Sequence, residues 1–245
     1  MLNLKEILLK PYNLFSTLIE NIFFEKKKVK INELLEKGFI KCKVLKANLE
    51  KNYFIEIKKS NNFLSKYEVK KNLIPELIKS IFVQTNLKDY ITNLTGFNYH
   101  INFFIAYKTA HIPEDLKNEQ IYANTWHKDK PFSKNTLKVI IPLEKIDIEN
   151  GPMEILDINQ SKKFNHKEII NKYLFVGKKN DIFLFFPNLC LHRAGSPEYA
   201  KSREQIMFQL NPAKKWSYSE YLFDRQLNLE PKFPMFDLND RRILI

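Results

Sequence analysis

The chain has 245 residues, of which 44% are hydrophobic and 13% are aromatic. This composition allows a sizeable buried core and excludes an intrinsically disordered or low-complexity protein. Forty lysines and arginines against twenty-eight aspartates and glutamates give a formal net charge of +12. Such a charge permits attraction to nucleic acid, anionic lipid or an acidic substrate. Because the lysines are spread along the chain, we interpret most of this charge as a solvated surface.

The first 24 residues, "MLNLKEILLKPYNLFSTLIENIFF", are apolar but interrupted by charged residues, and Pro11 is expected to break any helix there. The stretch has no small-residue cleavage site and no uninterrupted apolar span of ~20 residues, so it predicts neither a signal peptide nor a transmembrane helix. We expect an amphipathic helix docked on the domain, with a helix on a membrane surface as the alternative. Cys42 and Cys190 indicate no disulfide framework and no zinc site, and we expect a cytoplasmic protein.

The next segments read as helices with one strand. The basic run "EKKKVKI" at 25–31 is expected to precede a helix rather than to bind a phosphate. "INELLEKGFIKCKVL" predicts a short helix ended by Gly38 and a strand from about Phe39. The stretch 69–96 has helical spacing, with Gly96 as its terminator.

From residue 98 onward the pattern changes to short β-branched and aromatic runs bounded by Pro, Asn and Gly. These runs are "NYHINFFIAYKTA", "TLKVIIPLEKI", "DIFLFFPNLCLHRA" and "REQIMFQLNP". Several such strands with turn residues between them predict an all-β sandwich or barrel. No linker separates two domains, so we expect a single domain over 1–245. It comprises a helical segment at about 1–95, a β-core at about 97–212 and a tail at 213–245.

Three residues form a candidate metal site. In an extended chain, His127 and Asp129 of "WHKD" place their side chains on one face. This pair alone is a weak signal, since a surface histidine beside a lysine is the common case. His192 ends a strongly apolar strand, where a histidine is either hydrogen-bonded within the core or a ligand. Two histidines and one carboxylate form the facial triad of non-heme Fe(II) oxygenases.

An arginine follows the distal histidine. "LHRAGSPEYAKSREQIMFQL" reads as strand, turn and strand, and a hairpin centred between Pro197 and Glu198 would set His192 opposite Arg203. From there a guanidinium can reach past the metal and bind a carboxylate through two hydrogen bonds. A five-carbon dicarboxylate that chelates the metal at one end would present its other end at that point, which indicates 2-oxoglutarate.

Together these features resemble the phytanoyl-CoA dioxygenase family of Fe(II)/2-oxoglutarate-dependent oxygenases. The resemblance covers most of the chain, thinning before residue 30 and after 215. It rests on a set of motifs in family order: His127-Lys128-Asp129, Asn150-Gly151-Pro152-Met153, Asp181-Ile182-Phe183-Leu184-Phe185, His192 and Arg203. It implies a mainly β fold with flanking α-helices around a double-stranded β-helix (a jelly-roll, cupin-like core). It also implies Fe(II) held by His127, Asp129 and His192, and 2-oxoglutarate bound by Arg203.

The implied activity is hydroxylation of an unactivated C–H of a small-molecule substrate, with dioxygen consumed and succinate and CO2 released. The intact Asp129 favours hydroxylation, because related halogenases carry a small residue there. The chain departs from the family pattern at "LDINQSKKF", Asn180 and Ala194, which leaves the substrate open. The alternative is a cupin-like metal-binding protein without oxygenase activity. A nucleic-acid demethylase is disfavoured because Gln209 stands where such enzymes carry a second arginine, so we expect no nucleic-acid partner.

Several neighbours of these motifs carry weaker predictions. Gln205 and Met207 alternate with Arg203 and are expected on its face. Trp126 either walls the pocket or fills the core, and neither Tyr122 nor Asn124 can be assigned. Cys190 and the remaining histidines are interpreted as structural or surface residues: His100, His111 and His166.

Overall fold

The structure, a computed structural model, describes residues 4–24, 27–46, 49, 53–59, 61–129, 133–163, 171–219 and 242–243. Five α-helices lie in these ranges: α1 (Leu4–Phe23), α2 (Glu33–Lys37), α3 (Ile74–Phe82), α4 (Leu87–Thr95) and α5 (Ile158–Lys163). The strands begin with β1 (Phe39–Lys46), β2 (Phe54–Lys59), β3 (Leu64–Val69), β4 (Asn98–Ala110), β5 (Leu137–Pro142) and β6 (Glu154–Ile155). They continue with β7 (Tyr173–Leu174), β8 (Asp181–Phe185), β9 (His192–Arg193), β10 (Ser202–Ala213), β11 (Ser217–Tyr218) and β12 (Arg242–Ile243).

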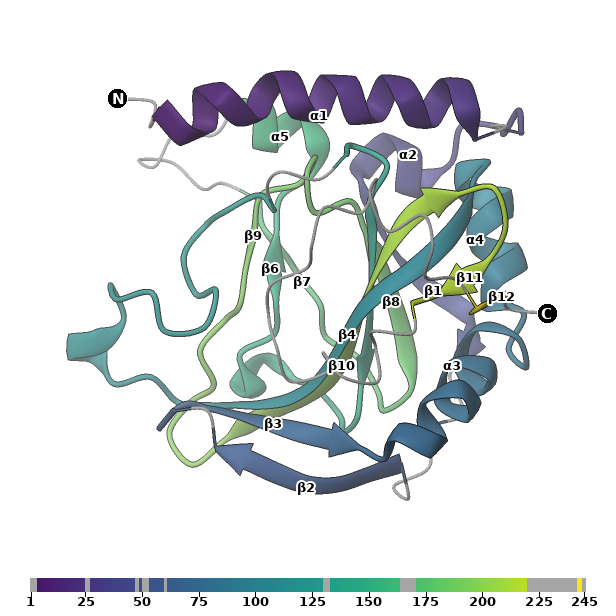
Figure 1. Ribbon diagram of the computed structural model, residues 1–245. Helices are drawn as coiled ribbons and strands as arrows, with labels where there is room; N and C mark the ends of the chain where they lie inside the picture. The colour runs from purple at the N-terminus through teal and green to yellow at the C-terminus, as the bar shows by residue number, and fades with distance from the viewer. Residues whose placement is uncertain are drawn as a thin grey trace.

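The strands form two sheets (Figure 1). The larger sheet has nine strands, with the order β1-β8-β5-β10-β4-β11-β12, and the pair β2 and β3 joins it through β4. The smaller sheet has the order β7-β6-β9. The long central strands β4 and β10 are antiparallel over nearly their whole length, with Ser202 opposite Ala110 and Ala213 opposite Asn98. The fold is therefore mainly β with a jelly-roll core, as predicted.

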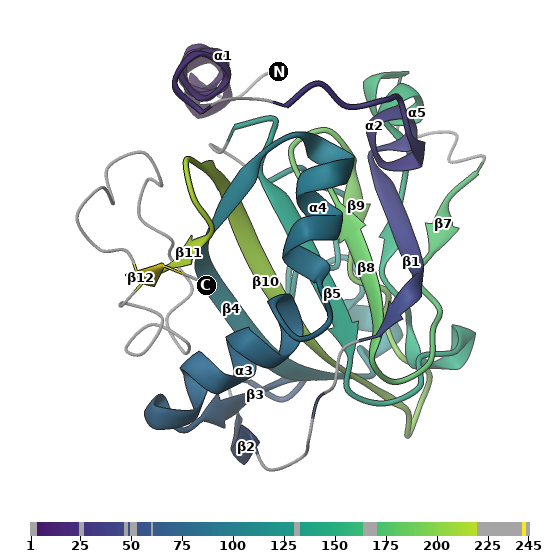
Figure 2. The same cartoon turned by 90° about the vertical axis from the view of Figure 1, so that its right-hand side faces the viewer.

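Two hydrophobic clusters stabilise this arrangement. Helices α3 and α4 cover the outer face of the larger sheet (Figure 2). The rings of Phe82 on α3 and Phe208 on β10 meet edge to face at 5.2 Å between centroids, a favourable aromatic geometry. The second cluster lies between the two sheets and includes Ile140, Ile155, Phe183 and Phe185. Successive side chains of β10 therefore point alternately into the two clusters. The side chains that point between the sheets border the site described below.

The predicted elements of the β-core match observed strands closely. Three of the four quoted runs each correspond to one strand, β4, β5 or β10, and the run 181–194 contains β8 and β9. Helices α2 and α4 end at Gly38 and Gly96, as predicted. Both glycines have the left-handed backbone that ends a helix, with φ angles of 88° and 83°. The segment 1–95 is not wholly helical, however. Besides the predicted β1, it contributes the antiparallel pair of β2 (FIEIKK) and β3 (LSKYEV), which was not predicted from the sequence.

Helix α1 departs from prediction in two ways. Pro11 lies within it rather than ending it, since the helix continues from Leu4 to Phe23. Its docking is polar: Glu20 accepts hydrogen bonds from the Ser133 hydroxyl and from Asn135 Nδ2, the latter at 3.2 Å. Thr17 Oγ1 accepts from the Lys134 amide at 3.2 Å. No helix in the described part of the chain is both long and apolar enough to cross a membrane.

The buried carboxyl of Glu20 makes the docking of α1 pH-dependent. Burial raises its pKa to about 7, against the smaller opposing effect of its two hydrogen bonds. A raised folded-state pKa means that the docked form is favoured at acidic pH and loses stability as pH rises toward and through 7. Glu20→Gln keeps both hydrogen bonds and removes the charge. At pH 8 we therefore expect this variant to slow hydrogen exchange of the α1 amides, with a free energy of local opening up to about 3 kcal/mol above that of wild type. Hydrogen exchange at pH 5 and pH 8 measures this, and an equal gain at both pH values would contradict it.

Candidate metal centre

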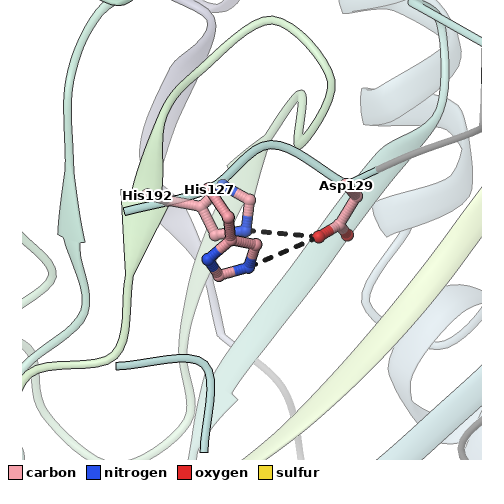
Figure 3. A group of neighbouring side chains, drawn as sticks. All are labelled: His127, Asp129 and His192. Carbon is pink, nitrogen blue, oxygen red and sulfur yellow. Dashed lines mark ion pairs between the residues drawn. The ribbon is translucent and has the colours of Figure 1, made fainter. Parts of the chain in front are cut away.

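Three side chains from two segments converge beside β9, the edge strand of the smaller sheet. His192 lies on β9, and His127 forms an isolated β-bridge with it through hydrogen bonds of 3.1 and 3.0 Å. Asp129 follows two residues later, where its amide donates to the Pro187 carbonyl at 3.1 Å. Asp129 Oδ1 lies 3.6 Å from Nε2 of each histidine, and the carboxylate faces both rings (Figure 3). The structure thus brings together the three residues predicted as metal ligands.

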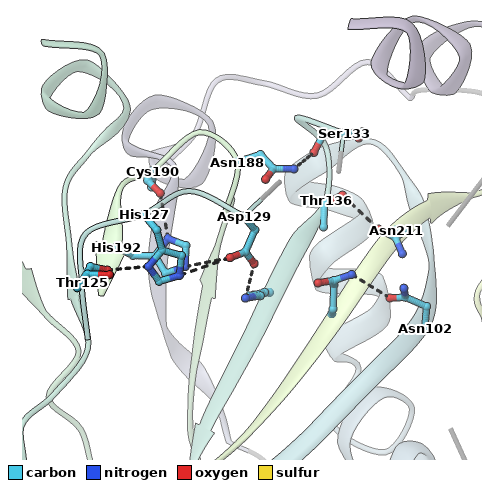
Figure 4. A network of polar contacts seen from close by, with 12 residues as sticks. Asn102, Thr125, His127, Asp129, Ser133, Thr136, Asn188, Cys190, His192 and Asn211 are labelled. Carbon is cyan, nitrogen blue, oxygen red and sulfur yellow. Dashed lines mark hydrogen bonds and ion pairs between the residues drawn. The ribbon is translucent and has the colours of Figure 1, made fainter. Parts of the chain in front are cut away.

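Backbone hydrogen bonds set the tautomer of both histidines. Nδ1 of His127 lies 2.8 Å from the Thr125 carbonyl, and Nδ1 of His192 lies 3.1 Å from the Cys190 carbonyl (Figure 4). A carbonyl oxygen only accepts, so each Nδ1 must carry the proton and each Nε2 keeps a free lone pair. Burial, together with the neighbouring His192, lowers the pKa of His127, which favours the neutral imidazole. Each ring thus turns Nε2 toward Asp129, and this is the nitrogen that could bind a metal ion.

Lys138 on β5 completes the environment of Asp129. Its ammonium pairs with Asp129 Oδ2, while Oδ1 faces the histidines. Burial acts to raise the pKa of Asp129, but the attraction of the Lys138 ammonium opposes it, and the pKa lies well below its usual range. The carboxylate therefore stays ionised, with one oxygen engaged by lysine and the other available.

This donor set fits a divalent transition metal. Two imidazole nitrogens and one carboxylate oxygen all lie within 4.8 Å of one another. Donors that share one ion at ~2.1 Å lie at most ~4.2 Å apart, a limit that both nitrogen–oxygen distances of 3.6 Å satisfy. Three protein ligands also leave coordination positions open for other molecules.

A cavity of about 390 Å³ adjoins these residues. His127, His192 and Lys138 line it at one side, and Arg203, Gln205 and Met207 of β10 line it as well, so the predicted alternation on β10 is observed. The rest of the wall is largely apolar, including Ile105, Ile140, Met153 and Phe185. Such a wall with a few convergent polar groups is typical of a small-molecule site.

Arg203 is 1% exposed, and its surroundings contain backbone carbonyls rather than a carboxylate. Nη1 donates to the Gly151 carbonyl and, at 3.1 Å, to the Gly195 carbonyl. Within the described ranges, Nε has no hydrogen-bond partner and no acidic side chain pairs with this guanidinium. A buried charge without a counter-ion is costly, and an anionic ligand would supply one.

The two glycines bring these carbonyls close together. A Cβ on Gly151 would lie 2.3 Å from the Pro197 nitrogen, and one on Gly195 would lie 2.4 Å from the Pro152 carbonyl. Only glycine permits this contact between the two loops. Asn150 Nδ2 donates to the Ser202 carbonyl at 2.9 Å and fixes the first loop beside β10. The Asn-Gly-Pro motif thus shapes the environment of Arg203.

The predicted hairpin between His192 and Arg203 is wrong. Strand β9 pairs with β6 in the smaller sheet, whereas β10 pairs with β4 and β5 in the larger one, with Arg203 opposite Thr109. The two residues line the same cavity from different sheets. The turn residues between the strands allow the chain to cross from one sheet to the other, and the larger sheet offers β10 two long partners.

The remaining predictions can now be placed. Tyr122 and Ala194 line the cavity, whereas Asn124 holds its own loop by accepting from the Ile121 amide at 2.8 Å. Trp126 stacks under the Arg193 guanidinium at 5.0 Å and does not line the cavity. The other residues have structural contacts: Cys190 is buried, His100 contacts Ser217, and His111 contacts the Pro197 carbonyl. His166 lies outside the described residues.

Lys138 was not recognised from the sequence. The available signal was a single lysine in the apolar strand "LKVIIP", since a buried ammonium needs a partner.

In metal-free protein, we expect Lys138→Met to lower the free energy of unfolding by about 3 kcal/mol at pH 7, because a buried carboxylate loses its counter-ion. The depressed pKa of Asp129 means that this loss shrinks as pH falls below about 4. Urea denaturation in EDTA measures it. Lys138→Met/Asp129→Asn should recover much of the loss, and an unchanged stability of the single variant would show that the pair contributes nothing.

Comparison with known proteins defines the class of fold. No protein-family model matches the sequence, and no curated protein matches it either. Solved structures do match. The non-heme alpha ketoglutarate dependent epimerase SnoN from nogalamycin biosynthesis has a TM-score of 0.52 and 13% identity, over 74% of this chain and 80% of that one. EctD from S. alaskensis with bound Fe has a TM-score of 0.51 and 13% identity, over 85% and 91%.

A second structure of EctD, with 2-oxoglutarate and 5-hydroxyectoine, has a TM-score of 0.51 and 14% identity, over 78% of this chain and 81% of that chain. At such identities the likeness is one of fold. The chain thus has the jelly-roll fold of non-heme, 2-oxoglutarate-dependent enzymes and carries a His-Asp-His set that could hold a metal.

Proposed function

We propose that the protein is an Fe(II)- and 2-oxoglutarate-dependent dioxygenase that hydroxylates an unactivated C–H of a small-molecule substrate, within a single domain over 1–245. His127, Asp129 and His192 are the proposed metal ligands, and Arg203 is the proposed partner of the far carboxylate of 2-oxoglutarate. The observation that carries this proposal is the buried Arg203 guanidinium, which shares one cavity with the two histidines and has no carboxylate partner among the described side chains.

Bound Fe(II) with 2-oxoglutarate and dioxygen would supply the oxidising power for hydroxylation, with succinate and CO2 released. The chain's own residues hold and orient the reactants. The two Nε2 atoms and Asp129 Oδ1 would bind the metal. Lys138 pairs with Asp129 Oδ2, so that the carboxylate offers the metal one oxygen. Arg203 fixes the cosubstrate by its charge. The apolar wall, with Ile140 and Met207, excludes water from the reacting atoms.

The likeness to the solved structures of two proteins supports the proposal. EctD is known with bound Fe and with 2-oxoglutarate, and SnoN is an alpha ketoglutarate dependent enzyme. A cupin-like metal protein would use the same three ligands but would have no need of a charged, unpaired Arg203. The arginine therefore favours the oxygenase over that alternative.

The proposal is tested by substrate-independent turnover. Protein loaded anaerobically with Fe(II) and 2-oxoglutarate should show a metal-to-ligand absorption band, and admission of air should yield succinate. Addition of candidate small molecules that raise the rate of succinate formation would identify the substrate class. Metal binding without either the band or succinate would support the cupin-like alternative.

A further inference from the structure

Helix α1 is docked with its polar side inward. Surface helices ordinarily bury an apolar stripe and expose charged residues. In the described side chains of α1, Ser16 and Glu20 are buried at 2% and 5% exposure. Five large apolar side chains instead have exposed fractions between 56% and 65%: Leu14, Phe15, Leu18, Ile22 and Phe23. The apolar side of α1 therefore faces away from the protein.

Four of these residues form one stripe. Leu14, Phe15, Leu18 and Ile22 fall within a third of a helical turn, because they are spaced by one, three and four residues. The helix lies straight across one end of the molecule (Figure 1), so residues that share one side of it form a continuous line. An exposed apolar stripe of this kind marks an interaction surface.

Exposed lysines lie at the same end of the molecule as α1. Lys27, Lys28 and Lys30 follow the helix, and Lys134 lies beside it through the Thr17 contact. Lys162 and Lys163 are exposed on α5, which both views place at the same end of the molecule (Figures 1 and 2). Among the described side chains from 14 to 30, none of the exposed ones is acidic.

We propose that this face of α1 binds the surface of an anionic lipid bilayer, with the helix lying in the plane of the interface. An apolar stripe flanked by basic residues inserts among acyl chains while the ammonium groups meet lipid phosphates. A net charge of +12 favours an anionic partner and opposes pairing of two copies through this face. Attachment is by surface insertion and does not require a spanning helix.

Membrane attachment would place the candidate metal centre near the bilayer. The residues on which α1 rests, Ser133 to Asn135, follow Asp129 by four to six positions. The short connection limits how far the metal ligand and the lipid-facing helix can separate. This position would suit a substrate that is drawn from, or returned to, the membrane surface.

The test is sedimentation of the full-length protein with vesicles of phosphatidylcholine alone or with 30% phosphatidylglycerol. Wild type should bind the anionic vesicles and lose most of this binding at high salt. Leu18→Glu/Ile22→Glu should lower binding by roughly tenfold or more, since it puts two charges into the stripe. Lys27→Glu/Lys28→Glu should weaken binding to the anionic vesicles only. Tyr199→Glu is a matched control at a site 85% exposed elsewhere and should bind like wild type.

Other outcomes would overturn the proposal. Absence of wild-type binding to anionic vesicles would do so directly, as would equal binding by the stripe variant. Analytical ultracentrifugation without lipid tests whether a second copy of the chain covers the stripe instead. A dimer that Leu18→Glu/Ile22→Glu converts to monomer would assign the stripe to a second copy of the chain. Neither readout depends on metal or 2-oxoglutarate, so failure here is distinct from failure of the proposed enzymatic function.

Discussion

Replacing His127 or His192 with alanine is expected to abolish turnover and to weaken Fe(II) binding by at least about 100-fold. Loss of residues that merely orient a ligand already costs 10- to 100-fold in metal affinity, and a direct ligand contributes more. Both histidines present a free Nε2 to the same point, where Asp129 Oδ1 lies 3.6 Å from each. Removal of either leaves two donors, which is too few to hold the ion firmly.

Metal content after dialysis and calorimetric titration with Mn(II) measure this effect without requiring activity. Mn(II), Co(II) or Zn(II) can occupy the same site, since affinity alone does not select iron. His111→Ala is the matched control, because His111 contacts the Pro197 carbonyl and has no place in the triad. It should retain one metal ion per chain. Retention of full activity by either triad variant would exclude the assigned ligands.

Arg203→Ala should raise the dissociation constant of 2-oxoglutarate by roughly 30- to 1000-fold while leaving metal affinity nearly unchanged. A charge-assisted pair shielded from water contributes on the order of 2–4 kcal/mol. The guanidinium is buried and, in the part of the chain that the structure describes, donates to the neutral carbonyls of Gly151 and Gly195. The cosubstrate carboxylate would supply the counter-ion that these described residues do not.

Anaerobic titration of Fe(II)-loaded protein with 2-oxoglutarate, followed by its absorption band, measures the constant directly. Arg203→Lys should recover only part of the affinity, because an ammonium does not form two parallel hydrogen bonds with a carboxylate. Arg203→Met separates charge from packing, since it keeps much of the side-chain volume. If wild type, Arg203→Ala and Arg203→Met bind 2-oxoglutarate equally, the arginine is structural and the cupin-like alternative gains support.

Much of the β-core and the candidate ligands could be predicted because their signals are local. Strand β4 coincides with the run Asn98–Ala110, whose β-branched and aromatic residues favour extended backbone. Gly38 and Gly96 end helices because each adopts a left-handed backbone. The spacing of His127 and Asp129 and the isolated polar character of His192 in an apolar strand likewise depend on neighbouring residues alone.

Other features depend on which distant segments meet, and these were missed or mistaken. The connection between His192 and Arg203 reads locally as a hairpin, but long-range pairing of β9 with β6 and of β10 with β4 and β5 separates them into two sheets. Lys138 gains its role only because β5 carries it to Asp129. Hydrophobic spacing shows that α1 is amphipathic, yet not which side it buries. That choice follows from hydrogen bonds between Glu20 and residues more than a hundred positions away, which no local pattern encodes.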